Sequence, residues 1–185
     1  MGHILVTGAT GWLGKSSINF LLNNNFAIKN IIAAASSNKS MDLGKLTAIP
    51  VEDFFNLNPS EEIDGIIHLA FLTREKVDSL TFENYVKMNN QITSKAVNLV
   101  KTVKPKWVVN VSSGAVFNSK NKELEQSLKN NPYGFLKLIE ENELKVAAHA
   151  VGANLIIGRL WGASGTFMQL NRAYALSDFI FQAYT

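Results

Sequence analysis

Short apolar runs recur along the chain and alternate with longer amphipathic segments. The runs cover residues 4–6, 28–35, 48–51, 63–70, 107–111 and 155–157. They are nearly continuous and lack the alternation of a strand with one solvated face, so they are typical of parallel strands buried on both faces. Pro50 marks its run as an edge strand or a strand end.

Helical patterns lie between these runs. Residues 12–22 and 132–150 have helical character, whereas the polar segment 118–131 is expected to be a loop. The clearest apolar stripe has three- and four-residue spacing and comprises Tyr85, Met88, Ile92, Ala96, Leu99 and Val103. Strands that alternate with helices predict βαβ units with right-handed crossovers, and therefore an α/β fold.

A glycine-rich loop joins the first apolar run to the first helix. Gly8, Gly11 and Gly14 are spaced GxxGxxG. A strand that turns tightly into a helix beside a pyrophosphate leaves no room for a Cβ at such positions, and the helix N-terminus offers N–H groups to phosphate. The residues of this loop expected to bind a dinucleotide are Gly8, Thr10, Gly11, Trp12, Leu13 and Gly14; the alternative is a structural turn without a ligand.

The expected architecture is a Rossmann-like, doubly wound parallel sheet with strand order 3-2-1-4-5-6 and the cofactor across the switch point. In sites selective for NAD, an acidic residue usually ends the second strand and binds the ribose 2′-hydroxyl. Here no carboxylate follows that strand, and Ser36, Ser37 and Lys39 stand where a 2′-phosphate could be held. The cofactor is therefore expected to be NAD(P), with a lean toward NADP.

A serine, a tyrosine and a lysine that suit hydride-transfer chemistry follow downstream of the glycine loop. Ser113 follows the fifth run, and Tyr133 and Lys137 lie one helical turn apart as YxxxK. Asn131 is expected to cap this helix and Pro132 to occupy its first position. Each motif alone is common on ordinary helices and loops, but their combination downstream of the glycine loop indicates a catalytic set.

The chemistry explains why these residue types occur together. A phenol has a reference pKa of about 10, so proton exchange at neutral pH requires a lower value. A lysine ammonium and an oxidised nicotinamide both favour the phenolate. We therefore expect Tyr133 to act as general acid or base, Lys137 to assist it and to bind the nicotinamide ribose, and Ser113 to orient the substrate oxygen while hydride passes to or from the nicotinamide.

These motifs resemble those of the extended short-chain dehydrogenase/reductases, the NAD-dependent epimerase/dehydratase family. The loop at 7–14 resembles the TGxxGxxG of that family, residues 68–71 its HLAA, residues 113–117 its serine loop, and the pair Tyr133 and Lys137 its catalytic pair. Asn89 with Thr93 is similar to its NxxGT helix. The resemblance implies cofactor contacts by Asp53, Phe54, Leu69, Ala70, Phe71, Asn89, Tyr133 and Lys137.

Several positions depart from the family pattern. Gly114 and Ala115 stand where the dehydratases have acidic residues, which argues against 4,6-dehydration. Phe117 replaces a usual tyrosine, and Gly162 replaces an asparagine that often helps to bind a nucleotide sugar. The resemblance covers the whole chain, which divides into a cofactor-binding domain at 1–170 and the start of a truncated substrate-binding lobe at 171–185.

Composition limits the remaining classes of function. With 46% hydrophobic and 18% charged residues the chain is expected to fold, and its net charge of +3 comes from scattered lysines, so no nucleic-acid partner is expected. The absence of cysteine excludes disulfides, cysteine–zinc sites and thiol nucleophiles. No apolar run suits a membrane span, so we expect a cytoplasmic protein. His68 and His149 have no partners spaced for a metal and are interpreted as structural.

These observations predict an NAD(P)-dependent oxidoreductase or epimerase that acts on a carbonyl or alcohol of a sugar or nucleotide-sugar-like substrate. The alternative is a cofactor-binding protein without catalysis, acting as a regulator or assembly partner. A homodimer is a further hypothesis, because in the family the helix at 85–103 and the Tyr133 helix form a four-helix contact between subunits. The competing interpretation is that both helices simply cover the sheet.

Overall fold

The computed structural model describes residues 2–36, 41, 49–77, 79–118, 122–168, 179, 182 and 183. Its strands are β1 (His3–Thr7), β2 (Ile31–Ala35), β3 (Val51–Asp53), β4 (Ile63–His68), β5 (Trp107–Ser113) and β6 (Asn154–Leu160). Its α-helices are α1 (Trp12–Asn23), α2 (Phe82–Val103) and α3 (Pro132–Val151), and its short 3₁₀ turns are η1 (Ile28–Asn30), η2 (Arg74–Lys76) and η3 (Gly114–Val116).

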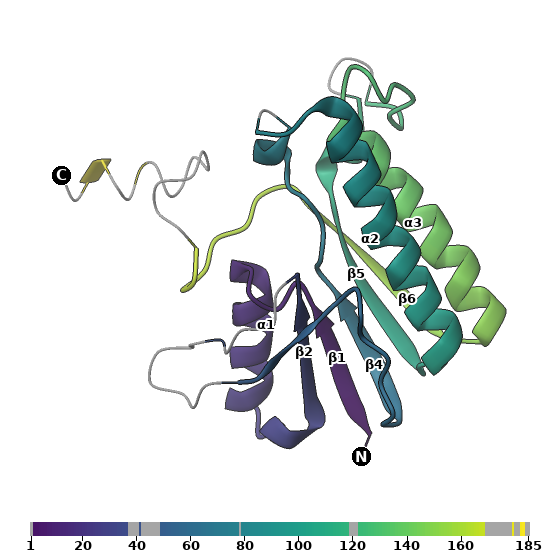
Figure 1. Cartoon of the computed structure of the whole chain (residues 1–185). Coiled ribbons are helices and arrows are strands. Elements are labelled where there is room, and N and C mark those ends of the chain that lie inside the picture. Colours follow the sequence, from purple (N-terminus) through teal and green to yellow (C-terminus); the bar gives the residue numbers. More distant parts are fainter. Residues whose placement is uncertain are drawn as a thin grey trace.

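The strands form one parallel sheet with the order β3-β2-β1-β4-β5-β6. This order confirms the doubly wound arrangement predicted from the sequence. The chain reverses its direction of travel across the sheet between β3 and β4, so the switch point lies between β1 and β4. Helix α1 covers one face, whereas α2 and α3 lie side by side on the other (Figure 1).

Both faces of β1, β2 and β4 are largely buried, as their continuous apolar runs predicted. The same prediction was wrong for β5, which alternates between buried and half-buried residues, and for the edge strand β6, where Ile156 is 62% exposed. Alternate residues of β1 pack on opposite faces of the sheet. Ile4 and Val6 pack in the layer with Ile18 of α1, whereas Leu5 packs in a second layer with Leu144 of α3. The stripe predicted on α2 belongs to this second layer, because Tyr85, Ile92, Ala96 and Leu99 are buried there, although Met88 is exposed. Most of the stripe therefore covers the sheet of its own chain and is not available to a second copy.

Several strand predictions were wrong at their boundaries: the run at 63–70 extends past β4, which ends at His68, and the run at 155–157 is shorter than β6. Residues 28–30 form η1, closed by the N–H of Asn30 donating to the carbonyl of Ala27, so that β2 begins only at Ile31. The third strand begins at Val51 and not at residue 48, since Pro50 has no N–H to donate to a ladder. Ile49 instead forms an antiparallel bridge with Met41.

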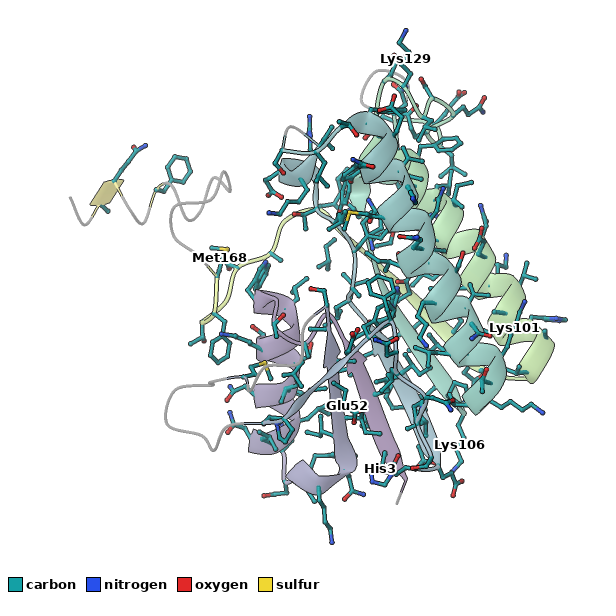
Figure 2. All side chains as sticks on the ribbon, in the orientation of Figure 1. His3, Glu52, Lys101, Lys106, Lys129 and Met168 are labelled. Carbon is teal, nitrogen blue, oxygen red and sulfur yellow. The ribbon has the colours of Figure 1, made fainter. Side chains whose placement is uncertain are left out.

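Charged side chains project from many separate elements. In Figure 2 Lys101 and Lys106 lie in the lower right part of the molecule, whereas Lys129 lies at the top. Lys106 pairs with Asp64 at the opposite end of the strands from the glycine loop. None of the helices in the described part of the chain combines the length and the apolar character needed to cross a bilayer. The segment 171–185, predicted to begin a substrate-binding lobe, lies almost entirely outside the described residues.

Helix α3 begins where the sequence predicted. The side chain of Asn131 accepts a hydrogen bond from the N–H of Gly134 at 2.9 Å, and Pro132 opens the helix. The amide of Asn131 also donates to the carbonyl of Ala115 at 2.9 Å, which joins the start of α3 to η3. Gly134 is required for this approach, since a Cβ there would lie 1.9 Å from the same carbonyl oxygen.

We expect Asn131→Ala to lower the free energy of unfolding by at least about 1–2 kcal/mol, because the cap and the bond to Ala115 are lost together. Urea unfolding measures the effect. The matched control is Thr81→Ala, which removes the exposed cap of α2, where Thr81 accepts from the N–H of Asn84 at 3.3 Å and holds no second element. An equal or larger loss in the control would contradict this view of the α3 junction.

Candidate functional site

The glycine loop makes the turn from β1 into α1. Gly8 has a φ of +66°, and a Cβ there would lie 2.7 Å from the backbone nitrogen of Ala70, beyond the end of β4. A Cβ at Gly14 would lie 2.4 Å from the carbonyl oxygen of Gly8. The turn therefore packs tightly against both β4 and α1. Only glycine meets the conformational and steric demands at position 8.

A cavity of about 260 Å³ opens beside this turn. It is lined by most of the residues that the sequence indicated for the cofactor, namely Gly8, Thr10, Gly11, Trp12, Leu13, Gly14, Ser36, Phe54, Leu69, Ala70 and Phe71. Gly11 is the N-cap of α1 and has no side chain to satisfy the first N–H groups of the helix. These groups and the positive end of the helix dipole suit a pyrophosphate.

Other predicted cofactor residues lie behind the lining or outside it. Asp53 uses its carboxylate within its own turn, accepting from the N–H of Phe55 and from the amide of Asn56, both at 2.9 Å. Asn89 is buried and accepts from the N–H of Leu72 at 2.8 Å, so that it supports the wall of the cavity. Its Nδ2 has no hydrogen-bond partner among the described residues. Ser37 lies outside the described residues.

The lining also includes residues that the sequence analysis missed. These are Ala35, Phe55, Leu72, Thr73 and Ile92. Each lies within a few residues of a recognised motif, so adjacency along the chain was the available signal. The uncapped start of α1 and the glycine cradle together fit a bound dinucleotide.

The predicted catalytic residues come from β5 and α3. Ser113 ends β5, and its hydroxyl accepts from the N–H of Ala115 at 3.1 Å. Tyr133 lies in the first turn of α3, which the bond from Asn131 to Ala115 holds against η3, directly after Ser113. The Tyr133 ring meets the Phe71 ring edge to face at 5.9 Å between centroids.

Lys137 is buried under the same ring. Its Nζ donates to the carbonyl of Val111 at 2.9 Å and to Oε2 of Glu140 at 2.8 Å. It also lies 4.0 Å from the centroid of Phe71. An ammonium has three N–H donors, and here a carbonyl, a carboxylate and a π face surround it. The ribose contact expected of Lys137 therefore requires Phe71 to move aside.

Glu140 was not anticipated from the sequence, and it is fully buried. Its Oε1 lies 3.2 Å from Nε2 of His68. Burial alone would raise the pKa of the Glu140 carboxyl, but the charge of Lys137 and the hydrogen bond from His68 outweigh it and hold the pKa below its usual value. His68 thus has a polar role inside the chain. Among the described residues no cluster of His, Asp or Glu side chains suits a metal ion.

Two aromatic side chains pack near Gly114, the residue after Ser113. The rings of Phe117 and Trp161 stack at 5.8 Å with an interplanar angle of 9°. A Cβ at Gly114 would lie 2.4 Å from the Trp161 ring, so glycine after Ser113 allows this approach. Arg159 lies over Phe117 and forms a two-point ion pair with Glu141 of α3 at 3.0 and 2.7 Å. Trp161 is 78% exposed.

Solved structures share this fold. The chain is 23% identical to MoeE5 in complex with UDP-glucose and NAD, with a TM-score of 0.70, and covers 58% of that chain with 92% of its own. It is 17% identical to the UDP-glucose 4-epimerase of Thermotoga maritima, with a TM-score of 0.75 and coverage of 96% of this chain and 61% of the other. It is 22% identical to the L-threonine dehydrogenase of Clostridium difficile, with a TM-score of 0.73 and coverage of 97% of this chain and 59% of the other.

The chain thus spans less than two thirds of the length of these structures. No curated protein is similar enough in sequence to count as a match. The model of the NAD dependent epimerase/dehydratase family matches residues 4–183, which is nearly the whole chain and includes every motif described above. The chain belongs to the NAD dependent epimerase/dehydratase family.

Proposed function

We propose that the protein is an NAD(P)-dependent oxidoreductase or epimerase that acts on a carbonyl or alcohol of a sugar or nucleotide sugar. One observation carries the proposal. Phe71 lines the cavity beside the glycine turn and also contacts both Lys137 and Tyr133. The cavity that suits a dinucleotide therefore ends at the pair of side chains that suits proton transfer.

The residues of the chain divide the work as follows. When bound, a nicotinamide dinucleotide would accept or supply the hydride. Ser113 already accepts from the N–H of Ala115, so its own hydroxyl hydrogen remains to donate to a substrate oxygen. The Tyr133 hydroxyl gives or takes the proton at that oxygen, as a general acid or base. Lys137 assists from below the ring of Phe71. Oxidation and reduction of the same carbon in succession would produce an epimer.

The aromatic wall formed by Phe117 and Trp161 supports a sugar-like substrate. It stands beside Ser113, and the exposed face of Trp161 offers a flat apolar surface to a ring. Two of the similar structures are described with UDP-glucose, and MoeE5 also occurs with UDP-glucuronic acid. We infer that a sugar ring of the substrate lies against Trp161.

The end of β2 supports a preference for NADP. Ser36 lines the cavity directly after Ala35, and no acidic side chain occurs between residues 33 and 39. On the neighbouring β3 the carboxylate of Asp53 accepts its hydrogen bonds within its own turn. At the end of β2, a ribose 2′-phosphate would therefore meet the hydroxyl of Ser36 in place of the usual acidic side chain.

One observation favours the second candidate, a cofactor-binding protein without catalysis. Lys137 is already surrounded, and the carboxylate of Glu140 balances its charge. A balanced ammonium stabilises a phenolate less than a free one does. This candidate predicts dinucleotide binding without turnover of any substrate.

Tyr133→Phe separates the two candidates. The substitution keeps the ring that packs on Phe71 but removes the hydroxyl that transfers the proton. We expect turnover of a sugar-nucleotide panel by the intact protein to fall by at least about 10²-fold, while the dinucleotide dissociation constant stays near that of the wild type. Unchanged turnover would refute the proposed catalytic role, and a wild-type protein that binds dinucleotide but turns over nothing would establish the second candidate.

A titration with NADPH and NADH tests the cofactor preference. We expect tighter binding of NADPH, because no carboxylate repels the 2′-phosphate. Fluorescence quenching of Trp12, which lines the cavity, offers a direct readout. Tighter binding of NADH would overturn the interpretation of Ser36 and Ser37.

The aromatic wall is tested by Trp161→Ala. We expect KM for the sugar substrate to rise roughly tenfold, the equivalent of about 1.4 kcal/mol of lost contact, with the dinucleotide affinity unchanged. Phe20→Ala is the matched control, since Phe20 is 66% exposed on α1 and contacts no part of the site. A KM that does not respond to the loss of Trp161 would place the substrate elsewhere.

A further inference from the structure

A fully buried carboxylate connects two other buried polar side chains behind the site. Glu140 lies between Nζ of Lys137, at 2.8 Å, and Nε2 of His68, at 3.2 Å, and all three side chains are at most 5% exposed. An isolated carboxylate in such a place would cost several kcal/mol. Its two partners are therefore what allows it to remain ionised inside the core.

The hydrogen bonds fix where the protons lie. The hydroxyl oxygen of Thr7 accepts from the N–H groups of Leu69 and Ala70, at 3.2 and 3.3 Å. With its lone pairs so engaged, it donates its own hydrogen to Nδ1 of His68 at 2.7 Å. His68 is then neutral with its proton on Nε2, and it donates to Glu140. The only formal charges in the chain of bonds are those of Lys137 and Glu140.

This chain of bonds reaches from the catalytic lysine to the cofactor turn. Thr7 is the last residue of β1 and precedes Gly8, and its partners Leu69 and Ala70 line the cavity. Lys137 is anchored at the other end on the carbonyl of Val111 in β5. In the sheet register Thr7 pairs with His68 and His68 with Asn110, so the bonds cross the carboxyl ends of β1, β4 and β5.

We propose that Glu140 is a positioning residue for Lys137. It holds the ammonium in one place and, through His68 and Thr7, fixes its position relative to the glycine turn. The inference rests on the proposed function in so far as Lys137 serves proton transfer. Its physical core, a buried lysine that depends on one buried carboxylate, is independent of any substrate.

The next residue of α3 provides a matched comparison. Glu141 is also buried, but its partner Arg159 is 33% exposed and sits on β6. Arginine stays protonated between pH 6.5 and 9.5, whereas a buried lysine that has lost its carboxylate partner loses its proton readily. If the charge of Glu140 is removed, Lys137 should therefore lose its proton within the pH range of the test. If the charge of Glu141 is removed, Arg159 should stay protonated.

The test begins with urea unfolding of the ligand-free protein between pH 6.5 and 9.5 for wild type, Glu140→Gln and Glu141→Gln. In Glu140→Gln, Lys137 loses its proton in the folded state at a pH where the unfolded chain still holds it. Because the unfolded state then binds more protons, stability rises with pH, and the unfolding equilibrium constant falls by up to tenfold per pH unit relative to the wild type. Glu141→Gln should be destabilised equally at every pH.

The other charged or titratable groups around Lys137 are the same in all three proteins. They are Tyr133 on α3, His68 on β4, Tyr85 on α2 and Arg159 on β6. Glu141 on α3 also carries a charge, and it is altered only in Glu141→Gln. Burial raises the pKa of Tyr85, so it stays protonated in the folded protein throughout this range. Subtracting the wild-type pH profile of the free energy of unfolding therefore cancels the contribution of the unchanged groups.

The double variant Lys137→Met with Glu140→Gln keeps the test decisive if Glu140→Gln does not fold. It removes both charges, so it should fold and show no slope relative to the wild type. A double variant that also fails to fold, or that retains the slope, would overturn the proposal. The proposal would also be overturned if the free energy of unfolding of Glu140→Gln changed with pH in the same way as that of Glu141→Gln.

Turnover supplies the second readout. We expect kcat of Glu140→Gln to fall progressively above neutral pH, to about a tenth or less of the wild-type value at pH 9, whereas Glu141→Gln should keep the wild-type pH profile. If Glu140→Gln shows the rise of stability with pH but the wild-type protein turns over no substrate, the buried pairing of Lys137 with Glu140 is upheld and the role of Lys137 in catalysis is refuted. Tyr133-dependent turnover with no slope would uphold the proposed function and refute the role of Glu140.

Discussion

The approach of the β1–α1 turn to the end of β4 is the constraint on which the site depends. Gly8 passes so close to Ala70 that no side chain fits between them, and the hydroxyl of Thr7 accepts from the N–H groups of Leu69 and Ala70. These contacts hold together the carboxyl ends of two strands at the switch point, where doubly wound sheets bind their ligands. The cavity, its uncapped helix and the ring of Phe71 follow from this junction.

A second junction places Tyr133 and Lys137 against Phe71, which lines that cavity. Asn131 and Gly134 let α3 begin against η3, so that Tyr133 lies near the end of β5 and Lys137 reaches back to Val111. The two junctions meet in the bonds from Thr7 through His68 and Glu140 to Lys137. The glycine turn and α3 are thus joined by one buried polar network.

Much of this arrangement is local and was therefore predictable. Continuous apolar runs separated by helices predicted the strand order, and Asn131 with Pro132 predicted the start of α3. The pairing of His68 with Glu140 joins residues 72 positions apart, and no periodicity encodes such a contact. One signal existed: Lys137, Glu140, Glu141 and Leu144 share one buried face of α3, and charges on such a face require partners. Phe71 was expected to contact cofactor, but its place above Lys137 depends on how β4 and α3 meet.

In the proposed function, one cleft joins the glycine turn to Tyr133 and Lys137. A crystal structure of the intact protein with bound NADPH would show whether it does. We expect the pyrophosphate against the first turn of α1, the nicotinamide ring beside Tyr133, and Phe71 displaced from Lys137. A dinucleotide bound away from the glycine turn, or one whose nicotinamide end lies far from Tyr133, would contradict the proposed function.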